Sequence, residues 1–239
     1  MPAFAETKQL DLPRLYCIVD AALFSTSTKL LAFADELVRA GCVLLQYRNK
    51  SGNARVMLAQ TRELKVQITS HSQVSQNQRD SAAGSGQALG HTNPSLNSVR
   101  LIMNDRPDLC LAADFEGVHV GQDDLSPESV RKIIGPDRWL GVSTHNPEQL
   151  QEADLTTAGY VAIGPVFATS SKENPDPVIG LEGVRRARAL TRKPLVAIGG
   201  ITRANAASVI DAGADSVAVI SDLLLEPRKS AEEFLRILG

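Results

Sequence analysis

Basic and polar side chains follow the second apolar run of the chain in a row that suits a polyanion. The segment reads Gln46-Tyr47-Arg48-Asn49-Lys50, and in extended backbone every second side chain points to the same face. Gln46, Arg48 and Lys50 therefore share a face. An arginine can bind two phosphate oxygens and a lysine adds a point charge, so the row predicts a pyrophosphate site. A solvated turn is the alternative, and it explains Lys50 alone better than all three.

Two aspartates follow the next two apolar runs. Asp105 comes after the third run and Asp124 after the fourth. In phosphate sites Mg²⁺ is usually held by one or two carboxylates together with the substrate. One such aspartate alone is more often a helix cap, but the two together, beside a basic row, predict that Asp105 and Asp124 hold Mg²⁺.

Hydroxyls, glycines and one lysine after the last three runs predict a second anion site. The sixth run leads into Thr169-Ser170-Ser171-Lys172, on a loop long enough to close over a ligand. The seventh run is followed by Gly199-Gly200, and the eighth ends at Ile220-Ser221. Glycines let a phosphate approach backbone N–H groups, and these two loops form a recurrent phosphate site in (β/α)8 barrels. Two anion sites in one pocket suit a reaction that joins two phosphorylated molecules.

Three further polar residues have less specific interpretations. Ser143 follows the fifth run and is expected to hydrogen-bond a substrate. His145 can serve as an acid or base, or it can make a structural hydrogen bond near the start of the next helix. His119 lies inside an apolar run, and we interpret it as an inner-barrel residue whose hydrogen bonds are satisfied.

Eight short apolar runs must position these groups, and buried parallel strands are near-continuously apolar. Helix signals lie between the runs, such as Ser126 and Asn146, each before a proline. This alternation predicts a single-domain (β/α)8 TIM barrel over residues 1–239, with an open doubly wound sheet as the alternative. The predicted strands are Leu15–Val19, Cys42–Tyr47, Val99–Met103, Gly117–Val120, Trp139–Val142, Tyr160–Ile163, Leu195–Ile198 and Ser216–Ile220, and the clearest predicted helices are Thr28–Ala40 and Thr202–Ala212.

A polar stretch from Thr69 to Asn97 interrupts the alternation. It is rich in Ser, Gln, Asn and Gly, a composition that stays solvated, and structureless loops beyond about 15 residues are uncommon in compact domains. It falls between the second helix and the third strand, on the side of the barrel remote from the expected site. We interpret it as a flexible insertion without a catalytic role, with a partner-binding segment as the alternative.

Composition limits the classes of partner. The chain has 25 basic and 27 acidic residues and a net charge of −2, which argues against nonspecific nucleic-acid binding. No apolar run approaches the roughly 20 residues of a membrane helix. Cys17, Cys42 and Cys110 are widely spaced, the first two within apolar runs where burial is expected. This spacing favours a reducing compartment, and with no secretion signal apparent we expect a cytoplasmic chain that binds phosphorylated small molecules; self-association into a homo-oligomer is left open.

Taken in order, the motifs resemble the thiamine-phosphate synthase (TenI-like) family along almost the whole chain, apart from the N-terminus and the Thr69–Asn97 stretch. The set is highly specific because eight separate segments match in the family's order. The matching segments are Gln46–Lys50, Asn104–Arg106, Gly117–Asp124, Gly141–His145, Gly164–Phe167, Thr169–Lys172, Ile198–Ile201 and Gly213–Asp215.

The resemblance implies an enzyme that joins a pyrimidine pyrophosphate to a thiazole phosphate, with Mg²⁺ bound by Asp105 and Asp124. It implies catalytic roles for Arg48, Lys50, Ser143 and Lys172. It implies that the pyrimidine pyrophosphate is bound by Gln46, Arg48, Lys50, Asn104, Ser143 and Lys172, and the thiazole phosphate by Thr169, Ser171, Gly200, Ile220 and Ser221.

Two features depart from the family's pattern. Ser171 stands where a threonine is usual, although it keeps the hydroxyl, and the polar stretch leaves the motifs intact. The nearest rival function is a TenI-type thiazole tautomerase, which needs no pyrophosphate or metal site, so Arg48 and Asp105 argue against it. The rival from another class is a non-catalytic phosphate-binding barrel whose insertion recruits a partner.

Overall fold

Eight parallel strands close into a barrel in this computed structural model, which describes residues 10–83, 99–169 and 176–239, with only the backbone for residues 71–83. β1 pairs with β2 on one side and with β8 on the other, so the sheet has no edge. This closure confirms the predicted single-domain barrel and excludes the open sheet. The strands are β1 (Leu15–Asp20), β2 (Leu44–Arg48), β3 (Arg100–Asn104), β4 (Gly117–Val120), β5 (Trp139–Thr144), β6 (Tyr160–Ile163), β7 (Leu195–Ile198) and β8 (Ser216–Val219).

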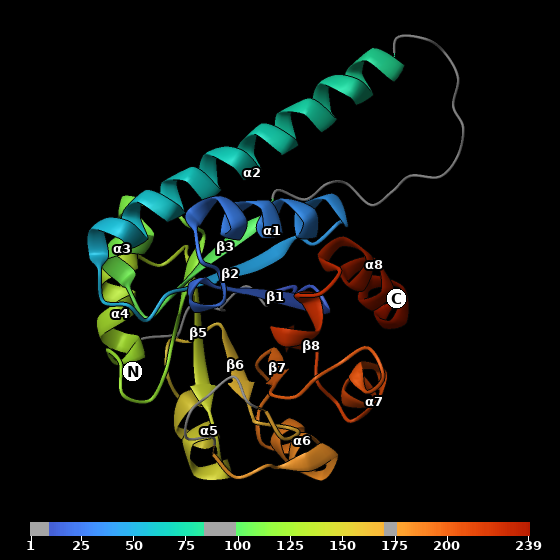
Figure 1. Ribbon diagram of the computed structural model, residues 1–239. Helices are drawn as coiled ribbons and strands as arrows, with labels where there is room; N and C mark the ends of the chain where they lie inside the picture. Colours follow the sequence, from blue (N-terminus) through green and yellow to red (C-terminus); the bar gives the residue numbers. More distant parts are fainter. Residues whose placement is uncertain (1–9, 84–98, 170–175) are drawn as a thin grey trace.

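Helices follow the strands and surround the barrel (Figure 1). The predicted caps are present at Ser126 and Asn146, whose side chains accept N–H groups at 3.3 and 2.9 Å. The helix predicted from Thr202 begins later, because Asn205 Oδ1 accepts the Thr202 N–H at 2.8 Å and holds these residues in a turn. The described helices are η1 (Ala21–Leu23), α1 (Ser27–Arg39), α2 (Ala54–Ala83), α3 (Pro107–Ala112), α4 (Pro127–Ile134), α5 (Pro147–Asp154), α6 (Gly180–Leu190), α7 (Ala206–Asp211), η2 (Ser221–Leu223) and α8 (Pro227–Leu238).

Helix α2 is longer than its composition suggested. It continues past α1 and beyond the barrel (Figure 1), so the prediction of a loop from Thr69 was wrong for residues 69–83. That part contains no proline or glycine before Gly84, and its Gln, Arg and Ala residues are good helix formers. The rest of the predicted insertion, residues 84–97, lies outside the described residues. Over the described parts of the chain, α2 included, no helix combines the length and apolarity needed to cross a membrane.

Alternation along each strand divides the buried residues into two cores. Outward-facing side chains such as Cys17 and Leu45 pack against the helices, and inward-facing ones such as Tyr16 and Ile18 fill the barrel. Both faces are buried, which explains the continuous apolar runs. Cys17 and Cys42 are buried free thiols, as predicted.

The strands end in polar residues that the apolar runs did not include. β2 extends to Arg48, which pairs with Asp20 of β1, and β5 extends to Thr144, which pairs with Ile163 of β6. The ladder therefore holds these residues in extended backbone. Side chains on strand ends are more precisely placed than side chains on loops.

The Phe234 ring is fully buried on α8. Replacing it with alanine should lower the free energy of unfolding by about 3–5 kcal/mol, because the change leaves a cavity. Ile237 on the same helix is 39% exposed, so Ile237→Ala is the matched control and should cost less than about 1 kcal/mol. Urea titration measures the free energy of unfolding of both variants. Equal decreases in the two would show that α8 does not pack on the barrel mainly through Phe234.

Candidate active site

A cavity of about 520 Å³ opens at the carboxyl ends of the strands, with wall residues from all eight. (β/α)8 enzymes place their active sites at this end. Ser171 and Lys172 lie outside the described residues. The other predicted site residues all line the cavity: Gln46, Arg48, Lys50, Asn104, Asp105, Asp124, Ser143, Thr169, Gly200, Ile220 and Ser221.

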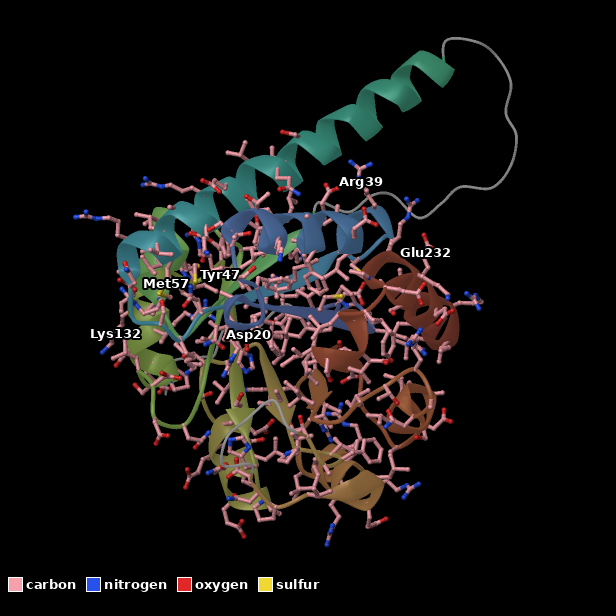
Figure 2. The ribbon with its side chains drawn as sticks, viewed as in Figure 1. Asp20, Arg39, Tyr47, Met57, Lys132 and Glu232 are labelled. Atoms are coloured by element: carbon pink, nitrogen blue, oxygen red, sulfur yellow. The ribbon has the colours of Figure 1, made fainter. Side chains whose placement is uncertain are left out.

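Arg48 is held at the wall by an aspartate that the sequence analysis did not single out. Its Nη1 bonds Asp20 Oδ2 at the end of β1, and Asp20 Oδ1 accepts the N–H of Ala22 at 3.1 Å. Asp20 is buried and lies near the middle of the view in Figure 2. It directly follows the first apolar run, the kind of position where the other site residues were sought, so that position was the signal that could have found it.

Lys50, Asp105 and Asp124 form a charged group beyond the ends of neighbouring strands. Lys50 Nζ bonds Asp105 Oδ2, and the Asp124 carboxylate interacts with that of Asp105. Asp124 Oδ2 also accepts the N–H of Gly121 at 2.7 Å. Asp105 has a φ of 62°, in the left-handed region that aspartate tolerates better than most residues and that often marks functional sites.

The pKa of Asp105 shows that its surroundings resist its ionisation. Burial raises this pKa, the Lys50 ammonium lowers it, and the nearby Asp124 carboxylate raises it again, so that the net direction is upward. The folded state therefore holds this proton more tightly than the unfolded chain does. The stability that Asp105 contributes is greatest at acid pH and is lost as pH rises through the raised pKa.

The carboxylates of Asp105 and Asp124 suit Mg²⁺ better than they suit a metal that takes all its ligands from the protein. Within the described ranges, no three or more His, Cys, Asp and Glu side chains form a group that could hold a metal. Mg²⁺ needs fewer protein ligands, because water and substrate phosphates complete its coordination. A cation beside Asp105 and Asp124 would also relieve the repulsion that raises the Asp105 pKa.

Asn104 offers the cavity an unused donor. Its Nδ2 is buried and has no hydrogen-bond partner among the described residues. A buried donor left unsatisfied costs about 1–3 kcal/mol. An acceptor on a bound ligand would remove that cost, since Asn104 lines the cavity.

The opposite wall is close-packed backbone after β6 and β7. Gly200 has a φ of 63°, and a Cβ there would lie 2.4 Å from Ala168 O, so no side chain fits without displacing that strand-6 loop. The Phe167 N–H donates to Gly199 O at 2.9 Å. These contacts bring the loop that carries Thr169 against the glycines.

Arg203 joins the loop after β7 to the loop after β8, and it was not among the predicted site residues. Its N–H and its Nε bond Asp222 Oδ2 at 2.8 and 3.0 Å, and its Nη1 bonds Glu233. Asp222 follows Ser221 directly, so the loops of Gly200 and Ser221 are fixed to each other. Arg203 belongs to no recognisable motif, so nothing in its sequence position pointed to this contact.

The two histidines of the site differ in their surroundings. His119 Nδ1 lies 3.1 Å from Tyr160 Oη and its Nε2 lies 2.8 Å from Ser143 Oγ, which confirms the interpretation of a satisfied inner-barrel residue. Burial lowers the pKa of His119 to about 4, so the ring is neutral at pH 7. His145 lines the cavity, and its Nδ1 lies 2.8 Å from Gly164 O.

Comparison with known sequences identifies a family for this chain. The family model for thiamine monophosphate synthase matches residues 73–223. A thiamine-phosphate synthase of Koribacter versatilis is 55% identical over 232 residues, which cover 96% of this chain and 97% of that protein. A thiamine-phosphate synthase of Chloroflexus aurantiacus is 39% identical over 208 residues, covering 87% and 83%.

Comparison with solved structures gives the same fold. A thiamine phosphate pyrophosphorylase from Pyrococcus furiosus has a TM-score of 0.74 at 28% identity and covers 94% of this chain and 95% of its own. A 3-hexulose-6-phosphate synthase has a TM-score of 0.62 at 13% identity, covering 95% and 100%. The second likeness is one of fold alone.

Mg²⁺ together with inorganic pyrophosphate should raise the melting temperature of the wild-type protein, because a ligand at a hundred times its Kd adds about 2.7 kcal/mol to stability. Asp105→Asn should abolish this rise. In metal-free buffer the same variant should melt above the wild type at pH 8, because the neutral amide removes a carboxylate whose ionisation is resisted. An undiminished response of Asp105→Asn to Mg²⁺ would show that the ion binds elsewhere.

Proposed function

The chain belongs to the thiamine-phosphate synthase family, and on that premise we propose how its cavity joins 4-amino-5-hydroxymethyl-2-methylpyrimidine pyrophosphate to 4-methyl-5-(2-phosphoethyl)thiazole. The observation that carries the proposal is that one cavity has two unlike walls. One wall holds Arg48, Lys50 and the carboxylate pair, and the other is the close-packed backbone around Gly200 and Ser221. Two phosphorylated molecules held in one space react as if they were parts of one molecule.

We assign the charged wall to the pyrimidine pyrophosphate. Arg48 is supported from behind by Asp20, which restrains a long side chain before the ligand arrives. The partnerless Nδ2 of Asn104 supplies a donor. Asp105 and Asp124 would hold Mg²⁺, which when bound neutralises charge on the pyrophosphate. The proposed ligands of this substrate are Gln46, Arg48, Lys50, Asn104, Ser143 and Lys172.

We assign the backbone wall to the thiazole phosphate. Because Gly200 has no side chain, the backbone segments of this wall pack closely and their peptide groups are open to a ligand. Such neutral donors suit a monophosphate. Arg203 and Asp222 hold the two contributing loops together. The proposed ligands of this substrate are Thr169, Ser171, Gly200, Ile220 and Ser221.

The reaction needs positioning and charge stabilisation more than it needs a nucleophile on the enzyme. As the C–O bond to pyrophosphate breaks, Arg48 and Lys50 neutralise the charge that grows on the leaving group. The bond pair leaves with the pyrophosphate, and the electron-rich aminopyrimidine stabilises the resulting methylene cation. The thiazole nitrogen then donates its electron pair to that carbon, which forms the C–N bond of thiamine phosphate.

The rival functions explain fewer residues. A thiazole tautomerase needs the backbone wall but has no use for Arg48 supported by Asp20 or for the aspartate pair. A non-catalytic phosphate-binding barrel would not need two walls that face each other across one cavity. The synthase uses both walls.

We propose a reducing compartment, such as the cytoplasm, for this chain. Cys17, Cys42 and Cys110 are all free and buried. Cys17 Sγ and Cys42 Sγ lie 3.4 Å apart as thiols, a state that a reducing compartment preserves. Phosphorylated small molecules are the proposed partners.

Mixing the purified protein with both substrates and Mg²⁺ tests the proposed function. We expect thiamine phosphate and pyrophosphate in equal amounts, measured by chromatography and by a phosphate assay after pyrophosphatase treatment. Absence of both products across a range of Mg²⁺ concentrations would exclude the synthase activity.

Asp105→Ala should lower kcat by about 100-fold or more, because the leaving group loses charge stabilisation. Asp108→Ala is the matched control, since Asp108 is a nearby aspartate that is 58% exposed and paired with Arg106. Steady-state kinetics should show near-normal turnover for Asp108→Ala. Near-normal turnover of Asp105→Ala would refute the metal assignment.

Gly200→Ala should raise the KM for the thiazole phosphate with little effect on the KM for the pyrimidine pyrophosphate. The added methyl would lie 2.4 Å from Ala168 O, so the backbone wall must shift while the charged wall stays in place. Varying each substrate at saturation of the other separates the two constants. An equal rise in both would mean that the two walls are not separate sites.

A further inference from the structure

A chain of hydrogen bonds crosses the floor of the cavity and links Gln46 on β2 to Ser143 on β5. Gln46 Nε2 lies 2.8 Å from Tyr16 Oη, which lies 3.1 Å from Tyr160 Oη. Tyr160 Oη lies 3.1 Å from His119 Nδ1, and His119 Nε2 lies 2.8 Å from Ser143 Oγ. The proposed function gives roles to the two ends of this chain and none to its middle.

Strand register and one glycine bring the middle of the chain together. His119 on β4, Gly141 on β5 and Tyr160 on β6 are neighbours in the ladder. A Cβ at Gly141 would lie 2.1 Å from the Tyr160 ring and 2.5 Å from His119 Nδ1. The rings of His119 and Tyr160 can therefore meet across β5 only because position 141 has no side chain.

The middle members are all uncharged at neutral pH. Burial raises the pKa of Tyr16 and of Tyr160 above the ordinary value for tyrosine and lowers that of His119 to about 4. Each hydroxyl then has one proton to donate, and the imidazole carries one N–H. The donors must follow one another in a consistent order along the chain.

Only two orders satisfy every member. In the first, Gln46 Nε2 donates to Tyr16, and Tyr16 donates to Tyr160. Tyr160 then donates to Nδ1 of His119, whose Nε2–H donates to Ser143. In the second, every bond is reversed, from the Ser143 hydroxyl to the carbonyl oxygen of Gln46. In a mixed order two donors or two acceptors face each other, and a buried polar group is left unsatisfied, which is unfavourable.

Gln46 Nε2 is the donor to Tyr16 Oη, and of the two orders only the first begins with that bond. This leaves Gln46 Oε1 as the acceptor for a ligand. Ser143 accepts from His119 and so has its own proton to donate. The cavity thus presents an acceptor on the β2 side and a donor on the β5 side, and the two are coupled through the chain.

We propose that Tyr16, Tyr160 and His119 are positioning residues that fix this pattern and so select a flat heteroaromatic ring with both an amino donor and a ring-nitrogen acceptor. An aminopyrimidine has both. Naming that ring as the substrate rests on the proposed function, whereas the order of the hydrogens does not. An analogue with a carbonyl in place of the amino group would set two acceptors against each other at Gln46 Oε1 and bind more weakly.

Nitrogen NMR of the His119 ring in the ligand-free, full-length protein tests the order directly, since the tautomer follows from the hydrogen bonds of the ring. The His119→Gln spectrum assigns the resonances. We expect the proton on Nε2 and none on Nδ1. A proton on Nδ1 would overturn the proposal, and this result would be independent of any activity.

Two variants interrupt the chain of hydrogen bonds at different members. Tyr160→Phe removes the partner of His119 Nδ1, so we expect mixed tautomers and a KM for the pyrimidine pyrophosphate raised about threefold to tenfold, as for one lost hydrogen bond. Tyr16→Phe should raise this KM similarly but leave the proton on Nε2, because Tyr160 still donates to Nδ1. A merely structural role of the tyrosines would not produce this split between the variants.

Tyr47→Phe is the matched control. Tyr47 is a buried tyrosine beneath the α1 and α2 layer (Figure 2), and its hydroxyl donates to Gln60 Oε1 at 2.5 Å outside the barrel. It should change neither the tautomer nor either KM. Unchanged KM values in Tyr160→Phe and Tyr16→Phe, with an active wild type, would overturn the positioning role, whereas an inactive wild type would overturn the proposed function instead.

Discussion

When a parallel sheet closes into a barrel, every second side chain points into the barrel interior, which bulk water does not fill. Any polar group placed there must find its partners on other strands. Lower in the barrel Tyr16, His119 and Tyr160 satisfy one another. Higher up, the same alternation carries Arg48 and Asn104 into the cavity, where the remaining donors await a ligand. The geometry of the site thus follows from strand register more than from loop conformation.

The cations of the charged wall are paired with carboxylates, so this wall carries little net charge. Arg48 bonds Asp20 and Lys50 bonds Asp105, each across neighbouring strand ends. These contacts restrain two long side chains, which reduces the entropy lost when a ligand binds. Binding then depends on local geometry and not on the field of the whole protein.

Much of the fold was readable from the sequence, because a doubly buried strand must be apolar on both faces. The same rule placed the strand ends near Arg48 and Asp105. The rule also pointed to Asp20, which directly follows the first run although it was not predicted as a site residue, whereas nothing in the sequence position of Arg203 indicated its contact with Asp222. Composition misled at residues 69–83, where a polar surface was taken for a loop although no residue breaks the helix. Polarity reports exposure, whereas helix termination needs proline, glycine or a cap.

The empty position at Gly141 has a consequence for how such sequences can change. A methyl there would collide with both Tyr160 and His119, so a side chain at 141 is compatible only with smaller groups at its two neighbours in the ladder. Positions 119, 141 and 160 should therefore vary as a set among relatives. A library that randomises one of them at a time would recover few working members, whereas one that varies all three together could reach a barrel with a different ring preference.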